Sequence, residues 1–332
     1  MVAACDPNET LGRAAAETAG CRYVADYREI LGDIDIASIV VPTGLHRRVA
    51  LDCLAAGVDV LVEKPIAGTL ADGQAIVDEA RLLGRTLAVG HVERFNPTFE
   101  AAAPLVRRPK YIRAERTSPY AFRSTDISAV HDLMIHDIEL VLALAAESAN
   151  APAEVTRVEA MGVCLCGGHP DVVQARLYLS TGCIADLVAN RVSPTVTREL
   201  QTWSAEGSVT MDLQQRTVTR FAPGPRVAAG ELPLDAFAAG VPVEELKPAL
   251  FADDGFFGLT DVPVAEGDAL TAELADFAAA VVEQRLPRVT GESGLAALRV
   301  ADRVLASVES HRWSDAGLTG PNVLLPPRRR AA

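Results

Sequence analysis

The sequence lacks long apolar runs, an excess of positive charge and paired cysteines. No stretch reaches the roughly 18 consecutive apolar residues of a membrane-spanning helix, and the first residues lack the charged start, apolar centre and cleavage site of a secretory signal. We therefore expect a cytoplasmic protein without a membrane partner. The formal net charge of -13 argues against a nucleic-acid partner, because the binding of phosphates requires a basic face.

The six cysteines do not show the spacing of a disulfide framework and are scattered among apolar residues, so we expect them to be reduced. Cys164, Cys166 and the following His169 form half of a zinc-binding pattern. The sequence offers no second pair of ligands for it. We therefore predict no metal site.

The chain of 332 residues, 49% of them hydrophobic, is long enough to form two domains. Residues 1–92 alternate apolar runs with helical patterns, which is typical of a parallel sheet with helices on both faces. The apolar runs show no alternation with polar residues, so these strands are expected to be buried on both faces. The expected strands cover 1–5, 36–41, 58–62 and 86–90, and the expected helices cover 11–19, 46–56 and 71–83.

After Lys110 the pattern changes, because a long helix over 129–147 is followed by several strands separated only by turns. This predicts a second, α+β domain with a mostly antiparallel sheet, closed by helices over 269–283 and 294–310. The segment 222–267 is rich in proline, glycine and acidic residues, and is either a substrate-covering element or partly disordered. A half-exposed sheet also predicts a homo-oligomer.

The first strand is not followed by a glycine-rich turn, which a dinucleotide-binding domain needs so that backbone N–H groups can approach a pyrophosphate. Instead it ends in Asp6-Pro7, and an acidic residue is expected about 20 residues after the glycines. Two interpretations stay open: the start was assigned too late, or the chain is truly truncated. Asp6 either binds the adenosine ribose, which favours NAD over NADP, or merely turns the chain.

Glu63-Lys64-Pro65 follows a buried strand, so both charged side chains are expected at the carboxyl end of the sheet, where open α/β sheets bind ligands. A lysine at this edge can hydrogen-bond a substrate hydroxyl and stabilise the alkoxide that forms as the proton leaves, while Glu63 orients the lysine or the nicotinamide. The alternative is a solvated surface pair.

Asp132 and His136 are four residues apart in the long predicted helix and are expected on one face of it. An acid at this spacing can fix the tautomer of a histidine and make it a general base near neutral pH. The alternative is a helix-surface ion pair of little energetic value. The apolar residues around the two predict a largely buried helix, which favours the catalytic interpretation.

Four motifs together resemble the glucose-fructose oxidoreductase/inositol dehydrogenase (Gfo/Idh/MocA) family. They are Val41-Pro42-Thr43-Gly44-Leu45-His46, Glu63-Lys64-Pro65, Gly90-His91-Val92-Glu93-Arg94-Phe95-Asn96-Pro97 and Asp132-x-x-x-His136. The last two, with Thr290-Gly291-Glu292-Ser293-Gly294, are most similar to dehydrogenases that oxidise the C3 hydroxyl of UDP-N-acetylglucosamine with NAD, on the way to lipid A.

The resemblance implies a Rossmann-like NAD-binding domain over 1–92, an α+β domain for substrate binding and oligomerisation over 93–317, and a tail over 318–332. It implies that Lys64 and His136 are catalytic and that Asp132 assists the histidine. The implied cofactor contacts, besides Asp6, are Thr43, His46, Glu63, Lys64 and His91. The implied substrate contacts are Lys64, Arg94, Asn96, Asp132 and His136.

Two other functions stay open. The motifs are shared with dehydrogenases of free sugars, inositols and other nucleotide sugars, and a fold does not identify a substrate. The missing first strand and glycine-rich loop depart from the family pattern, so a cofactor-free sugar-binding or scaffold protein is the second alternative. The joint presence of Lys64, Asp132 and His136 argues against it, because a non-catalytic protein does not need that set.

Overall fold

The computed structural model describes residues 1–122, 127–149, 152–166, 168–231, 256–313 and 319–324, together with positions 240, 242, 244 and 250. The chain divides into two compact units. Unit 1 comprises Met1–Val92 and Leu270–Arg299, and unit 2 comprises Glu93–Ala269 and Val300–Ala332. Much of the segment 222–267 and most of the predicted tail over 318–332 lie outside the described residues.

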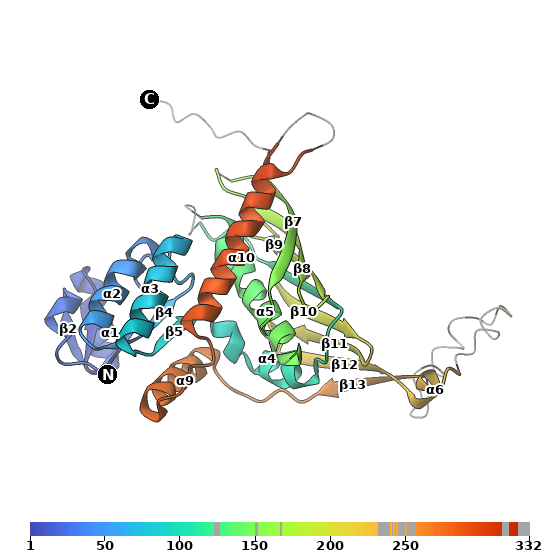
Figure 1. Cartoon of the computed structure of the whole chain (residues 1–332), viewed down its shortest axis with the longest axis horizontal. Helices are drawn as coiled ribbons and strands as arrows, with labels where there is room; N and C mark the ends of the chain where they lie inside the picture. The colour runs from blue at the N-terminus through green and yellow to red at the C-terminus, as the bar shows by residue number, and fades with distance from the viewer. Residues whose placement is uncertain are drawn as a thin grey trace. The chain divides into compact units, whose positions relative to one another are not determined.

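Unit 1 contains the predicted parallel strands. β3 (Ile36–Ile39), β4 (Asp59–Glu63) and β5 (Leu87–Gly90) form one parallel sheet in that order (Figure 1). β1 (Ala3–Cys5) and β2 (Arg22–Val24) form a separate parallel pair. The uninterrupted apolar run of β4 is buried from Asp59 to Val62, which is the pattern of a strand covered on both faces. The doubly wound, Rossmann-like character of this unit is therefore confirmed.

The helices of unit 1 begin and end where the sequence provides capping residues. α1 (Glu9–Ala19) begins at Asn8, whose side chain accepts the N–H of Leu11, and α3 (Leu70–Leu83) begins at Thr69, whose side chain accepts the N–H of Asp72. Both helices end at a glycine in the left-handed region, with φ of 64° at Gly20 and 62° at Gly84. The remaining helical elements are η1 (Tyr27–Glu29), η2 (Thr43–Leu45) and α2 (His46–Ala55).

Two C-terminal helices differ from the expected organisation. α9 (Ala269–Glu283), from Leu270 on, and the first part of α10 (Gly291–Ser310) belong to unit 1, although the sequence pattern placed them in the second domain. The physical reason is their packing. Phe277 of α9 lies against Leu61 and Ala88 of the parallel sheet, and a Cβ atom on Gly294 would come within 2.6 Å of Val89. The chain thus returns to complete the core of the first unit.

Unit 2 is built on a nine-stranded sheet in the order β13-β12-β11-β10-β6-β9-β8-β7-β14. Its neighbours are antiparallel except for the pairs β6–β9 and β7–β14, so the predicted mostly antiparallel sheet is confirmed. The strands are β6 (Tyr111–Thr117), β7 (Val155–Cys164), β8 (Val172–Leu179), β9 (Ile184–Asn190), β10 (Thr197–Ser204), β11 (Gly207–Asp212), β12 (Thr217–Pro223), β13 (Phe257–Val262) and β14 (Asn322–Val323). Within the segment 222–267, the structure adds α6 (Pro225–Ala228) and the edge strand β13.

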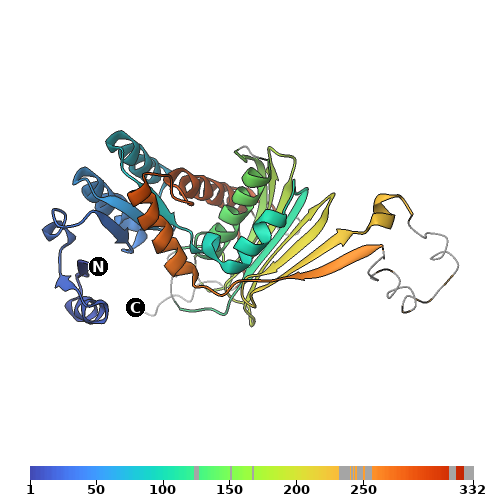
Figure 2. The ribbon, with the colours of Figure 1, turned by 90° about the horizontal axis from the view of Figure 1, so that it is seen from below.

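Helices cover one face of this sheet. α5 (Ile135–Ala149) contacts β6 and β9, and α4 (Pro97–Ala102) contacts β11 and β12. The end of α10 covers β7, where Ser307 accepts the N–H of Ala160 (Figure 2). The alternation of buried residues in β8 is set by this single covered face.

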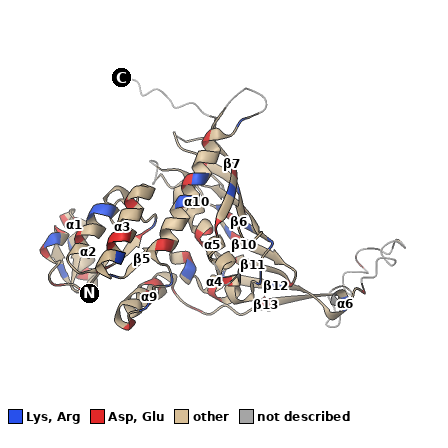
Figure 3. Cartoon of the chain, viewed as in Figure 1, with Lys and Arg blue, Asp and Glu red and all other residues tan. Residues whose placement is uncertain are grey.

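The other face of the sheet carries polar pairs such as Arg176 with Asp186 at 2.7 Å. Residues of both signs also occur along the helix α10 (Figure 3). Opposite charges that face each other on neighbouring strands stabilise the pairing of these strands on a solvent-facing surface. In the described part of the chain, no helix combines the length and the apolar character that a lipid bilayer requires.

Candidate active site

The carboxyl edge of the sheet in unit 1 brings together residues that are distant in sequence. Glu63 ends β4 opposite Gly90 of β5, and both Glu63 and Lys64 are half-buried. The Glu63 carboxylate accepts the backbone N–H of Lys64 at 3.0 Å. A Cβ atom on Gly90 would lie 3.1 Å from the Glu63 carboxyl carbon, so the glycine leaves the space in which this carboxyl group rests.

His46 fixes the backbone beside Lys64. Its ring is 1% exposed, and its two nitrogens lie 3.0 Å from the carbonyl oxygen of Pro65 and 2.9 Å from that of Val41. The Lys64–Pro65 peptide bond is cis. Thr43, half-exposed, opens the η2 turn that leads into His46. His46 therefore ties the ends of β3 and β4 together, and direct contact of Thr43 or His46 with a cofactor stays a prediction.

The other predicted cofactor residues follow strand ends as well. His91 comes directly after β5, is 1% exposed, and donates its backbone N–H to the carbonyl of Val89 at 2.8 Å. Asp6 comes after β1, is half-buried, and its carboxylate accepts the N–H of Asn8 at 2.7 Å.

The residues at these strand ends are chemically suited to hold NAD. A carboxylate held at the end of a parallel strand can accept hydrogen bonds from ribose hydroxyls, and Glu63 and Lys64 lie at the edge where such ligands bind. Asp6 is such a carboxylate at the end of β1, and its contact with a ribose stays a prediction. The turn between β1 and α1 is Asp6-Pro7-Asn8, which contains no glycine for the pyrophosphate.

In unit 2 the helix with Asp132 and His136 begins differently from the expectation. Residues Val130–Met134 form a π-helical turn, η5, and the α-helical part starts only at Ile135. A π turn has more residues per turn than an α-helix, so the expected α-helical spacing of Asp132 and His136 does not hold. Both residues are nevertheless partly exposed while Met134, Ile135 and Asp137 are buried. Asp132 and His136 thus keep part of their side chains accessible in a largely buried helix, although the Nδ1 atom of His136 is buried. π turns occur frequently at functional sites.

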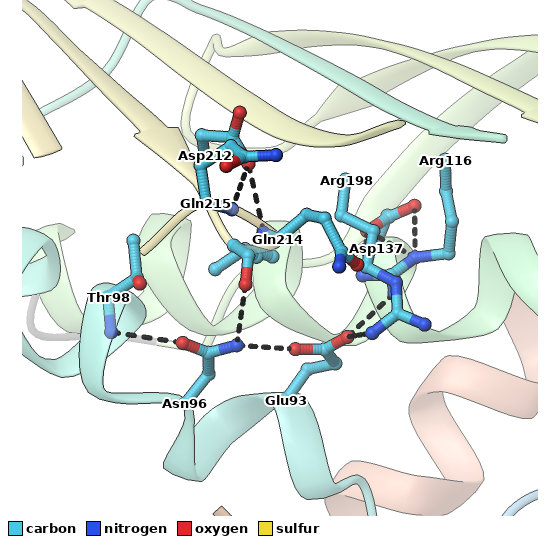
Figure 4. A network of polar contacts seen from close by, with 10 residues as sticks. Glu93, Asn96, Thr98, Arg116, Asp137, Arg198, Asp212, Gln214 and Gln215 are labelled. Atoms are coloured by element: carbon cyan, nitrogen blue, oxygen red, sulfur yellow. Dashed lines mark hydrogen bonds and ion pairs between the residues drawn. The ribbon is translucent and has the colours of Figure 1, made fainter. Parts of the chain in front are cut away.

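A buried ion-pair network holds this helix against the sheet (Figure 4). Arg116 of β6 is 4% exposed and donates to both carboxylate oxygens of Asp137 at 2.8 to 3.1 Å and to Glu93 at 2.7 Å. Burial alone would raise the pKa of Glu93, but Arg116, with Asn96 and Arg198, outweighs it, so this pKa is lowered. Burial would lower the pKa of Arg116, but Asp137 and Glu93 more than compensate and raise it. Burial raises the pKa of Asp137, and Arg116 opposes this effect. The two-pronged contact with Arg116 fixes Asp137, the residue next to His136.

Two of the five residues expected to bind substrate, Arg94 and Asn96, are engaged with protein groups. Arg94 is buried and pairs with Glu147 at 2.7 Å and Glu139 at 3.5 Å. Asn96 caps α4 by accepting the N–H of Thr98, and its amide group donates to Glu93 at 3.0 Å. These contacts give both residues a role in joining η3 (Val92–Phe95) and α4 to the rest of unit 2. Their contact with substrate stays a prediction.

Arg116, Asp137 and Glu139 were not among the residues predicted for this region. One sequence pattern could have found Arg116: it follows Ile112 and Ala114 at alternate positions of β6, and therefore points to the covered face of the sheet. A charged residue on that face requires a buried partner of opposite charge.

Comparisons with known proteins define the class. Residues 1–91 match the Gfo/Idh/MocA family model, described as an oxidoreductase family with an NAD-binding Rossmann fold. The chain is 31% identical over 302 residues to UDP-N-acetylglucosamine 3-dehydrogenase of Acidithiobacillus ferrooxidans, covering 89% of this chain and 87% of that enzyme. The solved structure of that enzyme aligns with a TM-score of 0.79 at 28% identity, over 93% of this chain and 90% of the other. A shorter match, 28% identical over 190 residues, is the scyllo-inositol 2-dehydrogenase (NAD(+)) of Bacillus subtilis, covering 52% and 54% of the two chains.

The chain belongs to the Gfo/Idh/MocA family of oxidoreductases. It is an enzyme of the kind that acts on CH–OH groups, and NAD is the cofactor of its family.

Proposed function

We propose that this chain uses NAD to oxidise a secondary hydroxyl of a sugar, with C3 of UDP-N-acetylglucosamine as the first candidate. The observation that carries the proposal is the match to UDP-N-acetylglucosamine 3-dehydrogenase over nearly the whole of both chains. The product is a 3-keto sugar, which in the expected pathway precedes lipid A. Residues 1–92 are proposed to bind the cofactor, and residues 93–317 to bind substrate and a second copy of the chain.

The chemistry assigned to the chain's own residues is proton removal. A secondary alcohol releases hydride readily only as its proton leaves, so the enzyme must supply a base and stabilise the developing alkoxide. We assign hydrogen bonding of the reacting hydroxyl to the Lys64 ammonium group and proton acceptance to the His136 imidazole. When bound, NAD supplies the nicotinamide ring that takes up the hydride.

The remaining site residues are proposed to support these two groups. Asp132 orients His136, and Arg94 and Asn96 lie toward the sugar. Asp6, Thr43, His46, Glu63 and His91 surround the cofactor. The placement of Glu63 and Lys64 at the carboxyl edge of a parallel sheet supports their assignment, because ligands of open α/β sheets bind at that edge.

The direct test is NADH formation at 340 nm, with UDP-N-acetylglucosamine, UDP-glucose, free N-acetylglucosamine and myo-inositol compared at equal concentrations. We expect the highest kcat/KM with UDP-N-acetylglucosamine. A higher value with myo-inositol would transfer the proposal to the inositol dehydrogenases of the family. Absence of NADH with every substrate, together with sugar binding, would instead support a cofactor-free binding protein.

The roles of the two assigned groups are tested by His136→Ala and Lys64→Met. Loss of a general base lowers rates by roughly 100-fold to 10,000-fold. We therefore expect His136→Ala to reduce kcat by at least about 100-fold with little change in NAD affinity. The control is His169→Ala, on a turn of unit 2 outside the proposed site, which should retain the parent rate. Near-normal turnover of His136→Ala would exclude His136 as the base.

A further inference from the structure

A glutamate is buried in unit 1, and none of the roles assigned above accounts for it. Glu273 of α9 is 2% exposed, and its Oε1 atom has no hydrogen-bond partner among the residues that the structure describes. An ionised carboxylate in such a position is unfavourable, because burial removes its hydration without replacing it. The side chain is therefore either neutral or matched to a neighbouring group.

The register of α9 on the sheet identifies this neighbour. Phe277 packs against Leu61 and Ala88, which are paired residues of β4 and β5. Glu273 is one turn before Phe277 on the same buried face of the helix. Side chains of a strand alternate between faces, so the next residue of β4 on this face, toward its carboxyl end, is Glu63. Figure 2 shows α9, in orange, beside the strands of this sheet.

The electrostatics agree with this placement. Burial, and secondly the charge of Glu63, raise the pKa of Glu273 to about 8. Lys64 follows Glu63 at the end of β4, His91 follows β5, and Asp276, one turn further along α9, pairs with Arg285 at 2.9 Å. The charge that raises the pKa of Glu273 is that of Glu63. Two facing carboxyl groups of this kind are stable when one of them keeps its proton.

We propose that Glu273 is a positioning residue whose neutral carboxyl group holds the Glu63 carboxylate over Gly90, where Glu63 accepts the N–H of Lys64. The inference rests on the proposed role of Lys64 in sugar oxidation. Ionisation of Glu273 brings a second negative charge beside Glu63 and drives it out of this position. The backbone of Lys64 then loses its hydrogen bond, and the cofactor edge of the sheet is disturbed.

The experiment compares Glu273→Gln with the parent and with Glu283→Gln, an exposed glutamate at the end of the same helix. Glutamine keeps the size and the hydrogen-bonding capacity of the neutral acid but cannot ionise. NAD affinity is measured by calorimetry from pH 6.5 to 9.5, and NADH formation is followed in parallel. Affinity is the primary readout, because proton removal in the chemical step depends on pH by itself.

The parent and Glu283→Gln should lose about tenfold in NAD affinity between pH 7 and pH 9, since a group of pKa about 8 is then mostly ionised. Glu273→Gln should change by less than about twofold over the same range. An equal decline in all three proteins would overturn the inference.

Thermal unfolding without ligands separates this inference from the proposed function. The pKa of Glu273 is higher in the folded chain than the ordinary 4.5, so its neutral form favours folding fully below about pH 4.5, and this contribution is lost as pH rises from there through about 8. Glu273→Gln should therefore become more stable relative to the parent as pH rises from 5 to 9. If both readouts separate the variants but no sugar is oxidised, the inference stands and the proposed function fails. If a sugar is oxidised but neither readout separates them, the inference fails alone.

Discussion

Replacement of Arg116 by leucine tests whether the buried ion pairs hold the helix that carries His136. Arg116 is the cation between Asp137 and Glu93. Its removal leaves both carboxylates buried and breaks the ion pair that Asp137 makes with it. Breaking a buried pair by removing one partner costs about 3 to 5 kcal/mol, because the remaining charge keeps its desolvation penalty. For a unit of this size, that corresponds to a fall in Tm of roughly 6 to 20 °C.

The assay is urea and thermal unfolding at pH 7, followed by circular dichroism. The matched control is Arg176→Leu, which breaks the pair with Asp186 on the other face of the same sheet, where Arg176 is 48% exposed. Exposed pairs contribute about 1 kcal/mol or less, so this variant should remain close to the parent.

A double variant sharpens the result. Arg116→Met with Asp137→Leu removes both members of the bidentate pair and fills the space with apolar groups, which is often neutral or stabilising in buried sites. It should recover a large part of the stability that Arg116→Leu loses. If Arg116→Leu is no less stable than Arg176→Leu, the network does not anchor the helix and the reasoning is wrong.

Two further predictions concern unit 2. Burial, opposed by Arg94, raises the pKa of Glu139 to about 7, so its neutral form favours folding at low pH and this contribution is lost as pH rises through 7. Glu139→Gln should therefore gain about 2 kcal/mol relative to the parent between pH 5 and pH 8 in urea titrations, and a constant difference would contradict the assignment. Gly207→Ala should destabilise the β11 hairpin by more than about 3 kcal/mol, because φ is +112° and the new Cβ atom would lie 2.0 Å from the carbonyl oxygen of Phe221. The control Gly182→Ala, with φ of +79° and open space around it, should cost about 1 kcal/mol, and equal losses in the two variants would refute the steric argument.

Local patterns were sufficient for the fold class. Uninterrupted apolar runs predicted the buried strands β4 and β5, whereas β1 and β3, predicted in the same way, are largely accessible. The helices predicted over 11–19 and 71–83 end as expected, because the left-handed residues Gly20 and Gly84 close them locally. Consecutive strands separated only by turns predicted the antiparallel sheet of the second half, because a short turn joins antiparallel neighbours whereas parallel strands need a long crossover. The motif of residues 63–65 was placed at a strand end, since the burial of the preceding residues is already visible in the sequence.

The helical pattern of α9 shows that one face is buried but does not show against which core it is buried. The sequence therefore assigned α9 to the wrong unit, and only the packing of Phe277 on Leu61 and Ala88 returned it to the parallel sheet. The same packing brings Glu273 to Glu63, two residues separated by most of the chain. No local rule predicts such a pair.

The sequence by itself determined three features of this protein: which residues end strands, which helices carry polar groups, and which family the motifs resemble. The tertiary structure alone decided that Arg116 meets Asp137 and Glu93, and that the helix before His136 opens with a π turn. Local features depend on propensity and periodicity, which a sequence displays directly. The position of a buried charge depends on partners from distant segments, and these meet only when the whole unit is packed.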